Sequence, residues 1–276
     1  MQDLEKLLYE EHTKYNQRLD RIRKCVGEFK GGISPLYNEN LCDKHLEVVM
    51  VPEEMDHGIG GNWYQVLNMA EFASADLKDI MDLELETAKA YVSEFKKGYN
   101  ELLSQNEGIF HILQNAHKAE RYSHAFFSRI STLLDNLYYL VSRYYYIDTA
   151  RTVESGASIR KAIEAGVKKY NPRLSCFLKQ HFGFSNRQKE FNSLRNPFLH
   201  NTPKLFIQPD IKPSEEPMRP QELVSFAYNA YVLFSDEPRK EKLFDYLFSF
   251  YQHSLGNAHQ AYTMVLESKR PAKEGQ

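Results

Sequence analysis

One segment restricts the possible folds of this chain more than any other. The stretch "AFFSRISTLLDNLYYLVSRYYYI", residues 125–147, is apolar around most of a helical circumference. A helix of this kind is usually buried on more than one side, either at the centre of a helical bundle or at a subunit interface. We therefore expect an α-helix over about residues 109–147, with other helices packed around it.

Apolar residues recur at helical spacing in much of the remaining chain as well. The expected helices cover residues 4–26, 75–105, 155–171, 186–200 and 221–267. Interruptions of the last one are expected at "SDEPRK" and at Gly256, because proline and glycine weaken helices. The pattern predicts an all-α fold, a helical bundle with additional helices towards the N-terminus.

Four segments depart from the helical pattern. Residues 29–40 contain two glycines and a proline that end the first helix. Residues 48–51 ("VVMV") are the only good strand-like run, and one short strand predicts an extended loop or a small hairpin. Residues 57–63 ("HGIGGNW") form a glycine loop without the spacing of a phosphate-binding or dinucleotide-binding loop, so we assign it a structural role. Residues 203–220 form a proline-rich connector.

Charge is unevenly distributed along the chain. The formal net charge of −2 excludes a uniformly basic nucleic-acid coat, but residues 157–200 carry nine basic against two acidic side chains, a net +7. A local positive field suits a phosphate-bearing ligand. The alternative is a basic patch that acidic surface elsewhere in the fold neutralises. The candidate RNA-binding residues in this segment are Lys168, Lys169, Arg187 and Lys189.

Cysteine usage and hydropathy indicate the compartment. Three widely spaced cysteines without a CxxC pair predict a reduced, cytosolic protein. The first residues, "MQDLEKLLYEEH", are charged and lack the apolar core of a signal peptide. No run approaches the roughly 18 apolar residues that a membrane span requires. We expect a soluble, cytoplasmic protein that does not enter membranes.

The stretch "SLRNPFLHNT", residues 193–202, places an arginine, an asparagine and a histidine around a proline. An apolar stripe at i, i+3 and i+7 anchors the expected helix, and Arg195 and His200 lie off that stripe. Pro197 removes a backbone N–H and crowds the preceding turn, which frees backbone groups there. These polar side chains therefore lie at a break in an anchored helix.

This combination of residues fits cleavage of a phosphodiester without a metal. Arginine presents a fixed fork of donors that suits a phosphate, and histidine accepts and releases protons near neutral pH. His200 would handle the proton of the RNA 2′-hydroxyl or of the leaving oxygen, while Arg195 would stabilise the charge on phosphorus. The alternative is a helix-end arginine in a salt bridge and a buried, hydrogen-bonded histidine.

The pattern Arg195-Asn196-x-x-x-His200 resembles the Arg-x(4–6)-His signature of the HEPN superfamily (higher eukaryotes and prokaryotes nucleotide-binding). The resemblance implies an all-α, usually dimeric protein. It also implies, as for many members, metal-independent endoribonuclease activity in toxin, phage-defence or RNA-processing roles. Arg195 and His200 match the family's catalytic pair, with Asn196 as the polar neighbour, whereas Pro197 departs from the family's smooth helix.

From the resemblance we expect three segments and one principal activity. Residues 1–105 form an N-terminal helical extension with the glycine-rich loop, residues 106–267 a HEPN-like bundle that carries the motif, and residues 268–276 a loose tail. The expected activity is cleavage of RNA to 2′,3′-cyclic phosphate and 5′-hydroxyl ends by a homodimer without a cofactor. The resemblance also allows a protein partner such as an antitoxin. The alternative is a catalytically silent HEPN-like module that binds RNA, nucleotide or a protein partner.

Weaker signals come from other polar groups. His117, Glu120 and His124 share one helix face at a spacing that can begin a metal site. No matching Glu-x-x-His helix accompanies them, so we interpret them as a solvated polar face and expect no metal.

A polar stripe crosses the otherwise apolar 125–147 segment, and we interpret it as solvent-facing, with a phosphate groove beside Arg195 as the alternative. Residues 144–146, three tyrosines, are interpreted as core or interface packing rather than as a base-stacking site. Cys176 has no local partner that would make it a nucleophile. The stripe consists of Arg129, Thr132, Asn136 and Arg143.

Overall fold

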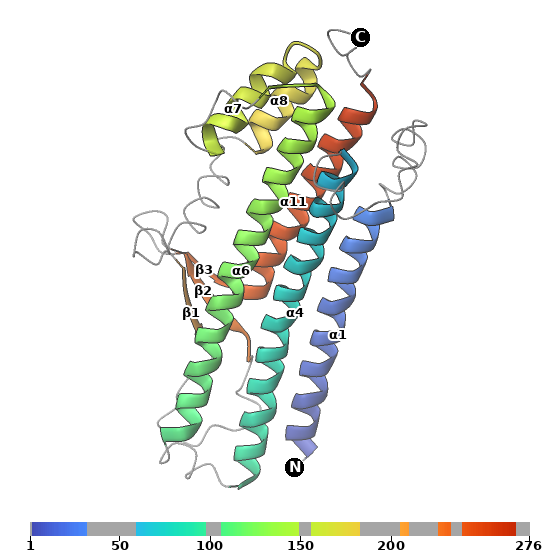
Figure 1. The fold of residues 1–276 in the computed structure, drawn as a ribbon. Coiled ribbons are helices and arrows are strands. Elements are labelled where there is room, and N and C mark those ends of the chain that lie inside the picture. The colour runs from blue at the N-terminus through green and yellow to red at the C-terminus, as the bar shows by residue number, and fades with distance from the viewer. Residues whose placement is uncertain are drawn as a thin grey trace. The chain divides into compact units, whose positions relative to one another are not determined.

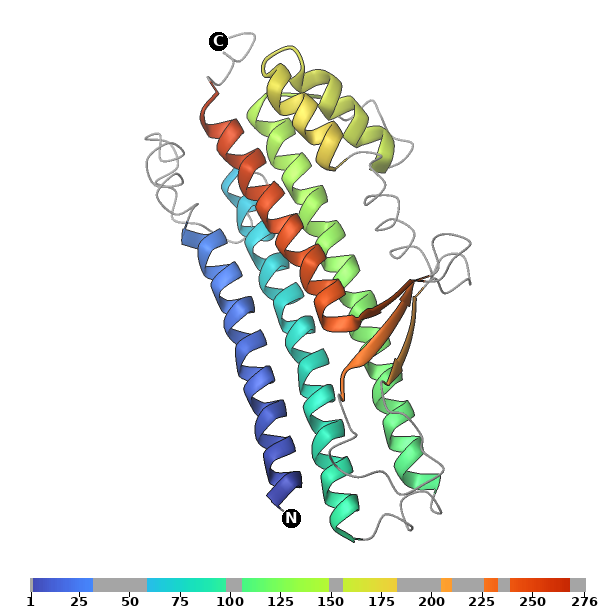
Figure 2. The same ribbon diagram turned by 180° about the vertical axis from the view of Figure 1, so that it is seen from behind.

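The computed structural model describes residues 2–31, 59–97, 106–148, 156–182, 205–209, 226–232 and 239–268. Most of these residues are helical, as the apolar periodicity predicts. None of the described helices contains a stretch long and apolar enough to span a lipid bilayer. The described helices are α1 (Gln2–Gly31), α4 (Ile59–Lys97), α6 (Asn106–Tyr144), α7 (Gly156–Val167), α8 (Pro172–His181) and α11 (Leu243–Leu266) (Figures 1 and 2).

The expectation of a glycine loop over residues 57–63 is wrong for residues 59–63, because α4 already begins at Ile59. The reason is a buried apolar stripe that continues back along the helix through Ala73, Ala70, Val66 and Trp63. The two glycines fall in the first turn of α4, where backbone N–H groups have no partner inside the helix. Burial of the stripe therefore outweighs the low helix propensity of glycine.

Helix α8 was not expected, because the helix expected over residues 155–171 ends directly before Pro172 and the next one is expected only at residue 186. Proline is well tolerated in the first turn of a helix, and here it opens α8. The side chain of Asn171 caps the helix by accepting a hydrogen bond from the N–H of Leu174 at 2.9 Å. Leu174, Phe177 and Leu178 then bury one face at i, i+3 and i+4. An Asn-Pro dipeptide before that spacing was the signal for this helix.

A three-stranded antiparallel sheet corrects two further expectations. Its strands are β1 (Leu205–Pro209), β2 (Tyr228–Val232) and β3 (Arg239–Lys242), in the order β1-β2-β3. The first strand lies in the expected proline-rich connector, and the other two lie where a helix was expected over residues 221–267. The expected interruption at Gly256 is also wrong, because α11 continues through it.

Burial explains why these short segments are strands. The central strand β2 is rich in aromatic and β-branched residues, and four of its five side chains are buried. Its neighbours are typical edge strands: β3 reads RKEK, and β1 exposes Phe206. Leu205 pairs with Val232 across the first ladder, and Asn229 pairs with Lys242 across the second. The sheet depends on pairing between distant segments, which local periodicity does not reveal.

Contacts divide the chain into two compact units, each assembled from three separate stretches. Unit 1 comprises Met1–Lys24, Ala73–Phe127 and Ser193–Phe250. Unit 2 comprises Cys25–Phe72, Ser128–Asn192 and Tyr251–Gln276. The division falls within α1, α4, α6 and α11. The segment boundaries expected from the sequence stay a prediction.

Aromatic side chains form much of the core of unit 1. Phe127 of α6 packs edge-on against Phe250 of α11, with ring centroids 5.6 Å apart, and against Tyr246 at 6.5 Å. Leu77 of α4 and Tyr228 of β2 are fully buried. The sheet is therefore part of the packed core of this unit and not a surface attachment.

Unit 2 has its own aromatic core. The Trp63 ring stacks on Tyr262 with centroids 4.1 Å apart, and Phe29 packs against Trp63 at 5.9 Å. The Tyr251 hydroxyl donates a hydrogen bond to the carbonyl of Ala70 at 2.8 Å. Tryptophan and tyrosine rings contribute large buried areas, so these contacts hold α4 and α11 together in this unit.

The apolar circumference of α6 is covered within the chain itself. Within the apolar segment 125–147, the part that belongs to unit 2 has these buried apolar residues: Ile130, Leu133, Leu134, Leu137, Tyr138, Leu140, Val141, Tyr144 and Tyr145. Gly166 of α7 permits a close approach there, because a Cβ at this position would lie 2.9 Å from the side chain of Ile147. Burial inside the chain thus accounts for this apolar helix without a subunit interface.

Candidate functional site

The predicted catalytic residues Arg195, Asn196 and His200 lie outside the described residues. So do Arg187 and Lys189, two of the four predicted RNA-binding residues. The catalytic and binding roles of these five residues therefore stay predictions.

The other two predicted RNA-binding residues, Lys168 and Lys169, lie in the turn between α7 and α8, and both are exposed. Figure 1 shows α7 and α8 side by side, joined by this turn. Backbone hydrogen bonds shape the turn, since the N–H of Lys169 donates to Gly166 O at 3.2 Å and that of Tyr170 to Val167 O at 2.9 Å. Two cations are thus presented to solvent from a hydrogen-bonded backbone.

Asn171 links this turn to α6 and α11. Besides capping α8, its side-chain NH₂ donates to the Tyr145 hydroxyl and to the Met264 carbonyl, each at 3.2 Å. The Tyr145 hydroxyl also forms a 2.6 Å hydrogen bond with Ser268 Oγ. One side chain therefore satisfies groups from three elements, which fixes the position of the turn within unit 2.

Tyr170 follows the two lysines and is 48% exposed. Its ring stacks nearly parallel on Tyr145, with centroids 5.8 Å apart and an interplanar angle of 13°. Tyr144 and Tyr145 are buried, so their interpretation as packing residues is confirmed, whereas Tyr146 is exposed and has a positive φ of 53°. Sequence reasoning overlooked Tyr170, although its position directly after Lys168 and Lys169 was a usable signal.

The basic segment is partly neutralised within the described residues. The Arg160 guanidinium donates two hydrogen bonds to one oxygen of Asp135, at 2.6 and 3.1 Å, and lies over the Tyr138 ring. Glu164 is buried and accepts a 2.7 Å hydrogen bond from the Tyr138 hydroxyl. Burial and this nearby carboxylate raise the pKa of the Tyr138 hydroxyl above its usual range. Arg160 therefore contributes to the packing of α7 against α6.

Within residues 159–182 the exposed charged side chains are all of one sign. Between residues 159 and 182, every charged side chain that is exposed is a lysine or an arginine. These side chains belong to Lys161, Lys168, Lys169, Arg173 and Lys179. The exposed charges within this stretch are therefore all positive, whereas Asp148 and Glu267 from neighbouring parts of unit 2 are exposed acidic residues.

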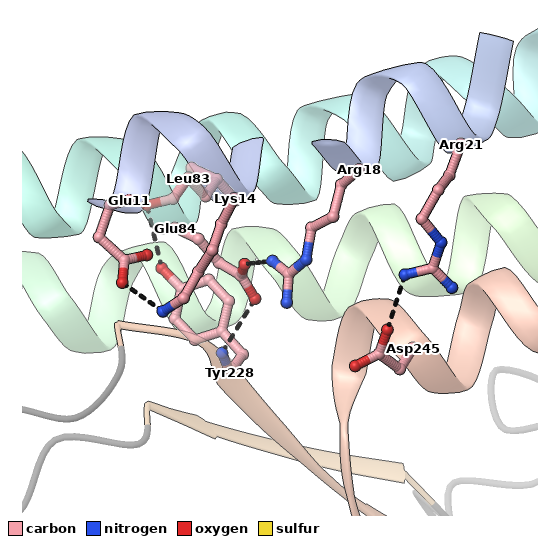
Figure 3. A network of polar contacts seen from close by, with 8 residues as sticks. All are labelled: Glu11, Lys14, Arg18, Arg21, Leu83, Glu84, Tyr228 and Asp245. Carbon is pink, nitrogen blue, oxygen red and sulfur yellow. Dashed lines mark hydrogen bonds and ion pairs between the residues drawn. The ribbon is translucent and has the colours of Figure 1, made fainter. Parts of the chain in front are cut away.

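A second polar cluster lies in unit 1 and was not expected from the sequence. Glu84 of α4 is only 5% exposed and forms an ion pair with Arg18 of α1 (Figure 3). The other carboxylate oxygen accepts the backbone N–H of Tyr228 at 3.1 Å. The Tyr228 hydroxyl forms a 3.0 Å hydrogen bond with Thr87, one helical turn further along α4. The cluster joins α1, α4 and β2.

Aromatic rings extend this cluster towards the surface. The guanidinium of Arg18 lies 4.5 Å from the centroid of the Phe244 ring, and that of Arg21 lies 4.5 Å from the Phe248 ring. Arg21 also pairs with Asp245 at 3.3 Å, and both of those side chains are about half exposed (Figure 3). Cation–π contacts of this kind attach α1 to the start of α11.

The environment of Glu84 favours a structural role. Burial raises the pKa of this carboxyl above its ordinary value, and the Arg18 guanidinium and the Tyr228 N–H offset that rise only in part. A perturbed buried acid can mark a catalytic site. Here, however, each carboxylate oxygen already has a protein partner. We interpret the cluster as the contact that fixes β2 against α1 and α4.

His117, Glu120 and His124 lie along one face of α6. Glu120 lies 3.6 Å from His117 and 3.9 Å from His124. Among the residues that the structure describes, no group of three or more His, Cys, Asp or Glu side chains is placed to hold a metal ion. His117 is exposed as expected, whereas the His124 side chain is largely buried, and this burial lowers its pKa.

The polar stripe on α6 is partly used inside the chain. The Arg129 guanidinium donates to the Phe72 carbonyl of α4 at 3.0 Å and lies over the ring of the same residue. Thr132 bonds to the Ser128 carbonyl of its own helix. Arg129 therefore belongs to a helix–helix contact and does not simply face solvent.

Cys176 is a free, exposed thiol.

Comparison with other proteins adds no family assignment. Neither protein-family models, nor curated proteins, nor solved structures match this chain. A function must therefore be argued from the residues of the chain itself.

Proposed function

We propose that this protein is a metal-independent endoribonuclease in which Arg195 and His200 form the catalytic pair. The pattern Arg195-Asn196-x-x-x-His200 carries the proposal, because its residue types and spacing resemble those of the HEPN superfamily. The mostly helical character of the described residues supports the resemblance. A toxin or phage-defence role, with a protein partner such as an antitoxin, belongs to the same proposal.

The chemistry requires only groups that the pair and RNA supply. The 2′-hydroxyl loses its proton and attacks the adjacent phosphorus, and the bond from phosphorus to the 5′ oxygen breaks as that oxygen gains a proton. His200 transfers these protons, and Arg195 stabilises the charge on the phosphoryl oxygens. In a two-fold symmetric dimer, two copies of the pair would face one scissile phosphate.

Incubation of labelled RNA with the purified protein in excess EDTA tests the proposal. We expect cleavage by the wild-type chain and none above background by the Arg195→Ala/His200→Ala variant. Circular dichroism would establish that the variant is folded. Equal cleavage by both proteins, or no cleavage by either, would contradict the proposal.

A second candidate function has its own support in the exposed positive turn. A catalytically silent HEPN-like module would bind RNA, nucleotide or a protein partner through this surface without cleaving anything. Lys168 and Lys169 would serve such a module equally well, because phosphate contacts supply affinity in a sequence-independent manner. Binding of labelled RNA, measured by fluorescence anisotropy, together with no cleavage in the EDTA assay would favour this candidate.

The proposed homodimer leads to a prediction about mass. Static light scattering at micromolar concentration should give twice the mass of one chain. Many apolar side chains of α6 are already buried within the chain, whereas Tyr139 of the same helix is 41% exposed. A monomer mass over the whole concentration range would contradict the homodimer and leave each catalytic pair on its own.

The exposed lysines lead to a prediction about salt dependence. Lys168→Gln/Lys169→Gln should weaken RNA binding and reduce the slope of log K against log salt by about 1.4, since each phosphate contact to a single strand contributes about 0.7. Lys6→Gln/Lys89→Gln, which alters two exposed lysines elsewhere, changes the net charge equally. Fluorescence anisotropy with a 2′-O-methyl oligoribonucleotide, which resists cleavage, measures both slopes across a salt series. Identical slopes for the two variants would assign the turn no part in RNA binding.

A further inference from the structure

The Tyr170 ring is exposed, yet one of its two faces is packed against the protein. One ring face stacks on Tyr145, and that ring is buried and held by hydrogen bonds from its hydroxyl to Asn171 and Ser268. Nearly half of the Tyr170 surface nevertheless faces solvent. An aromatic side chain that is already oriented loses little conformational freedom when a flat ligand stacks on its outer face.

Cationic residues flank Tyr170 in the sequence. Lys168 and Lys169 precede it and Arg173 follows it in the first turn of α8, and all three are exposed. The nearest acidic side chain in sequence, Glu164, is buried and faces Tyr138. Residues 159–182 thus offer an aromatic face and positive charge without an exposed carboxylate, and Glu267, which precedes Ser268, is an exposed acidic residue directly after the end of α11.

We propose that the α7–α8 turn is a stacking surface for unpaired nucleotides, in which Tyr170 receives a base while Lys168, Lys169 and Arg173 contact the flanking phosphates. Proteins that bind single strands combine stacking on aromatic rings with a positively charged path for the backbone. A duplex keeps its bases stacked on one another, so only the cations of this turn would serve it. The inference rests on RNA as the ligand of the proposed function and adds the surface that holds it.

Binding of a nucleotide strand that resists cleavage tests this surface separately from catalysis. The probe is a fluorescein-labelled 2′-O-methyl oligouridylate, which has no free 2′-hydroxyl, and the readout is anisotropy with the full chain. Tyr170→Ala and Tyr170→Leu should weaken binding roughly 5- to 150-fold, the range for loss of one base–aromatic stack. Tyr170→Phe keeps the ring and should bind within about twofold of wild type.

Two controls isolate the stacking contribution. Tyr64→Ala removes an equally exposed tyrosine of α4, 47% against 48%, and should leave affinity unchanged. The same oligonucleotide annealed to its complement should bind equally well to wild type and to Tyr170→Ala. Wild-type affinity in Tyr170→Ala, equal losses in Tyr64→Ala, or binding to anionic lipid vesicles but not to the oligonucleotide would overturn the inference.

Cleavage of unmodified RNA, measured in parallel, distinguishes this inference from the proposed activity. Tyr170-dependent binding without cleavage would support the surface and contradict the ribonuclease. Cleavage of RNA together with equal binding by wild type and the Tyr170 variants would support the ribonuclease and contradict the surface.

Discussion

Replacing Arg18 with alanine should destabilise the protein by about 3–5 kcal/mol, because Glu84 would retain a buried charge without its partner. The Glu84 side chain is 7% exposed and that of Arg18 is 17% exposed, so water can replace little of the lost interaction. The loss should be largest in unit 1, where the pair joins α1 to α4 and β2. Urea denaturation followed by circular dichroism measures the change in the free energy of unfolding.

Two further variants separate the lost ion pair from general damage to α1. Arg18→Met/Glu84→Gln removes both charges and keeps an acceptor for the Tyr228 N–H, so it should recover most of the loss. Arg21→Ala, three residues further along α1, breaks a half-exposed pair with Asp245 and should cost at most about 1–2 kcal/mol, including its cation–π contact. Equal losses in Arg18→Ala and Arg21→Ala would contradict the structural role of Glu84.

The deficit of Arg18→Ala should also depend on pH. The pKa of Glu84 in the folded protein is already raised by burial, and loss of Arg18 removes a group that lowers it. A carboxyl with a raised folded pKa stabilises the fold at low pH, and this contribution is lost as the pH rises through that pKa. The difference from wild type should therefore shrink as the pH falls from neutrality towards the ordinary value of 4.5. A deficit that grows in acid would contradict this assignment.

The second large effect concerns catalysis. His200→Ala should lower the rate of RNA cleavage about 10²- to 10⁴-fold, roughly 3–5 kcal/mol of barrier, because proton transfer would be lost. Arg195→Ala should cost a similar amount through lost charge stabilisation, and Arg195→Lys should not restore the full rate, since lysine lacks the planar fork. Single-turnover rates with saturating enzyme measure both. A rate for His200→Ala within tenfold of wild type would remove this residue from the mechanism.

Much of the helical architecture could be predicted from the sequence, because long apolar stripes depend only on local spacing. The stripe around residues 125–147 correctly predicted the buried part of α6. Predictions failed where a residue has two structural meanings. The helix expected over residues 155–171 ends before Pro172, but proline is also a good first residue of a helix, and here it opens α8.

The sheet and the buried ion pair could not be predicted in the same way. Tyr228–Val232 is a strand because segments distant in the chain pair with it, and short apolar runs are ambiguous between helix and strand. Arg18 and Glu84 are 66 residues apart, and no local pattern connects them. Long-range contacts of this kind require the fold itself.

The candidate site likewise has some features that local sequence predicts and others that require the fold. Charge counting identified the basic segment that contains Lys168 and Lys169, and the structure shows both side chains exposed. Charge counting could not predict that Arg160 pairs with Asp135, or that Tyr170 is oriented by Tyr145. Both facts depend on which side of each helix faces the core of unit 2.

The ends of the RNA products test the central proposal most directly. Mass spectrometry of a wild-type digest prepared in excess EDTA should show 2′,3′-cyclic phosphate and 5′-hydroxyl ends, and single-stranded DNA treated in parallel should stay intact, because it has no 2′-hydroxyl. Products with 5′-phosphate ends, cleavage that requires Mg²⁺, or equal cleavage of DNA would contradict an Arg195–His200 ribonuclease that uses the 2′-hydroxyl of its own substrate.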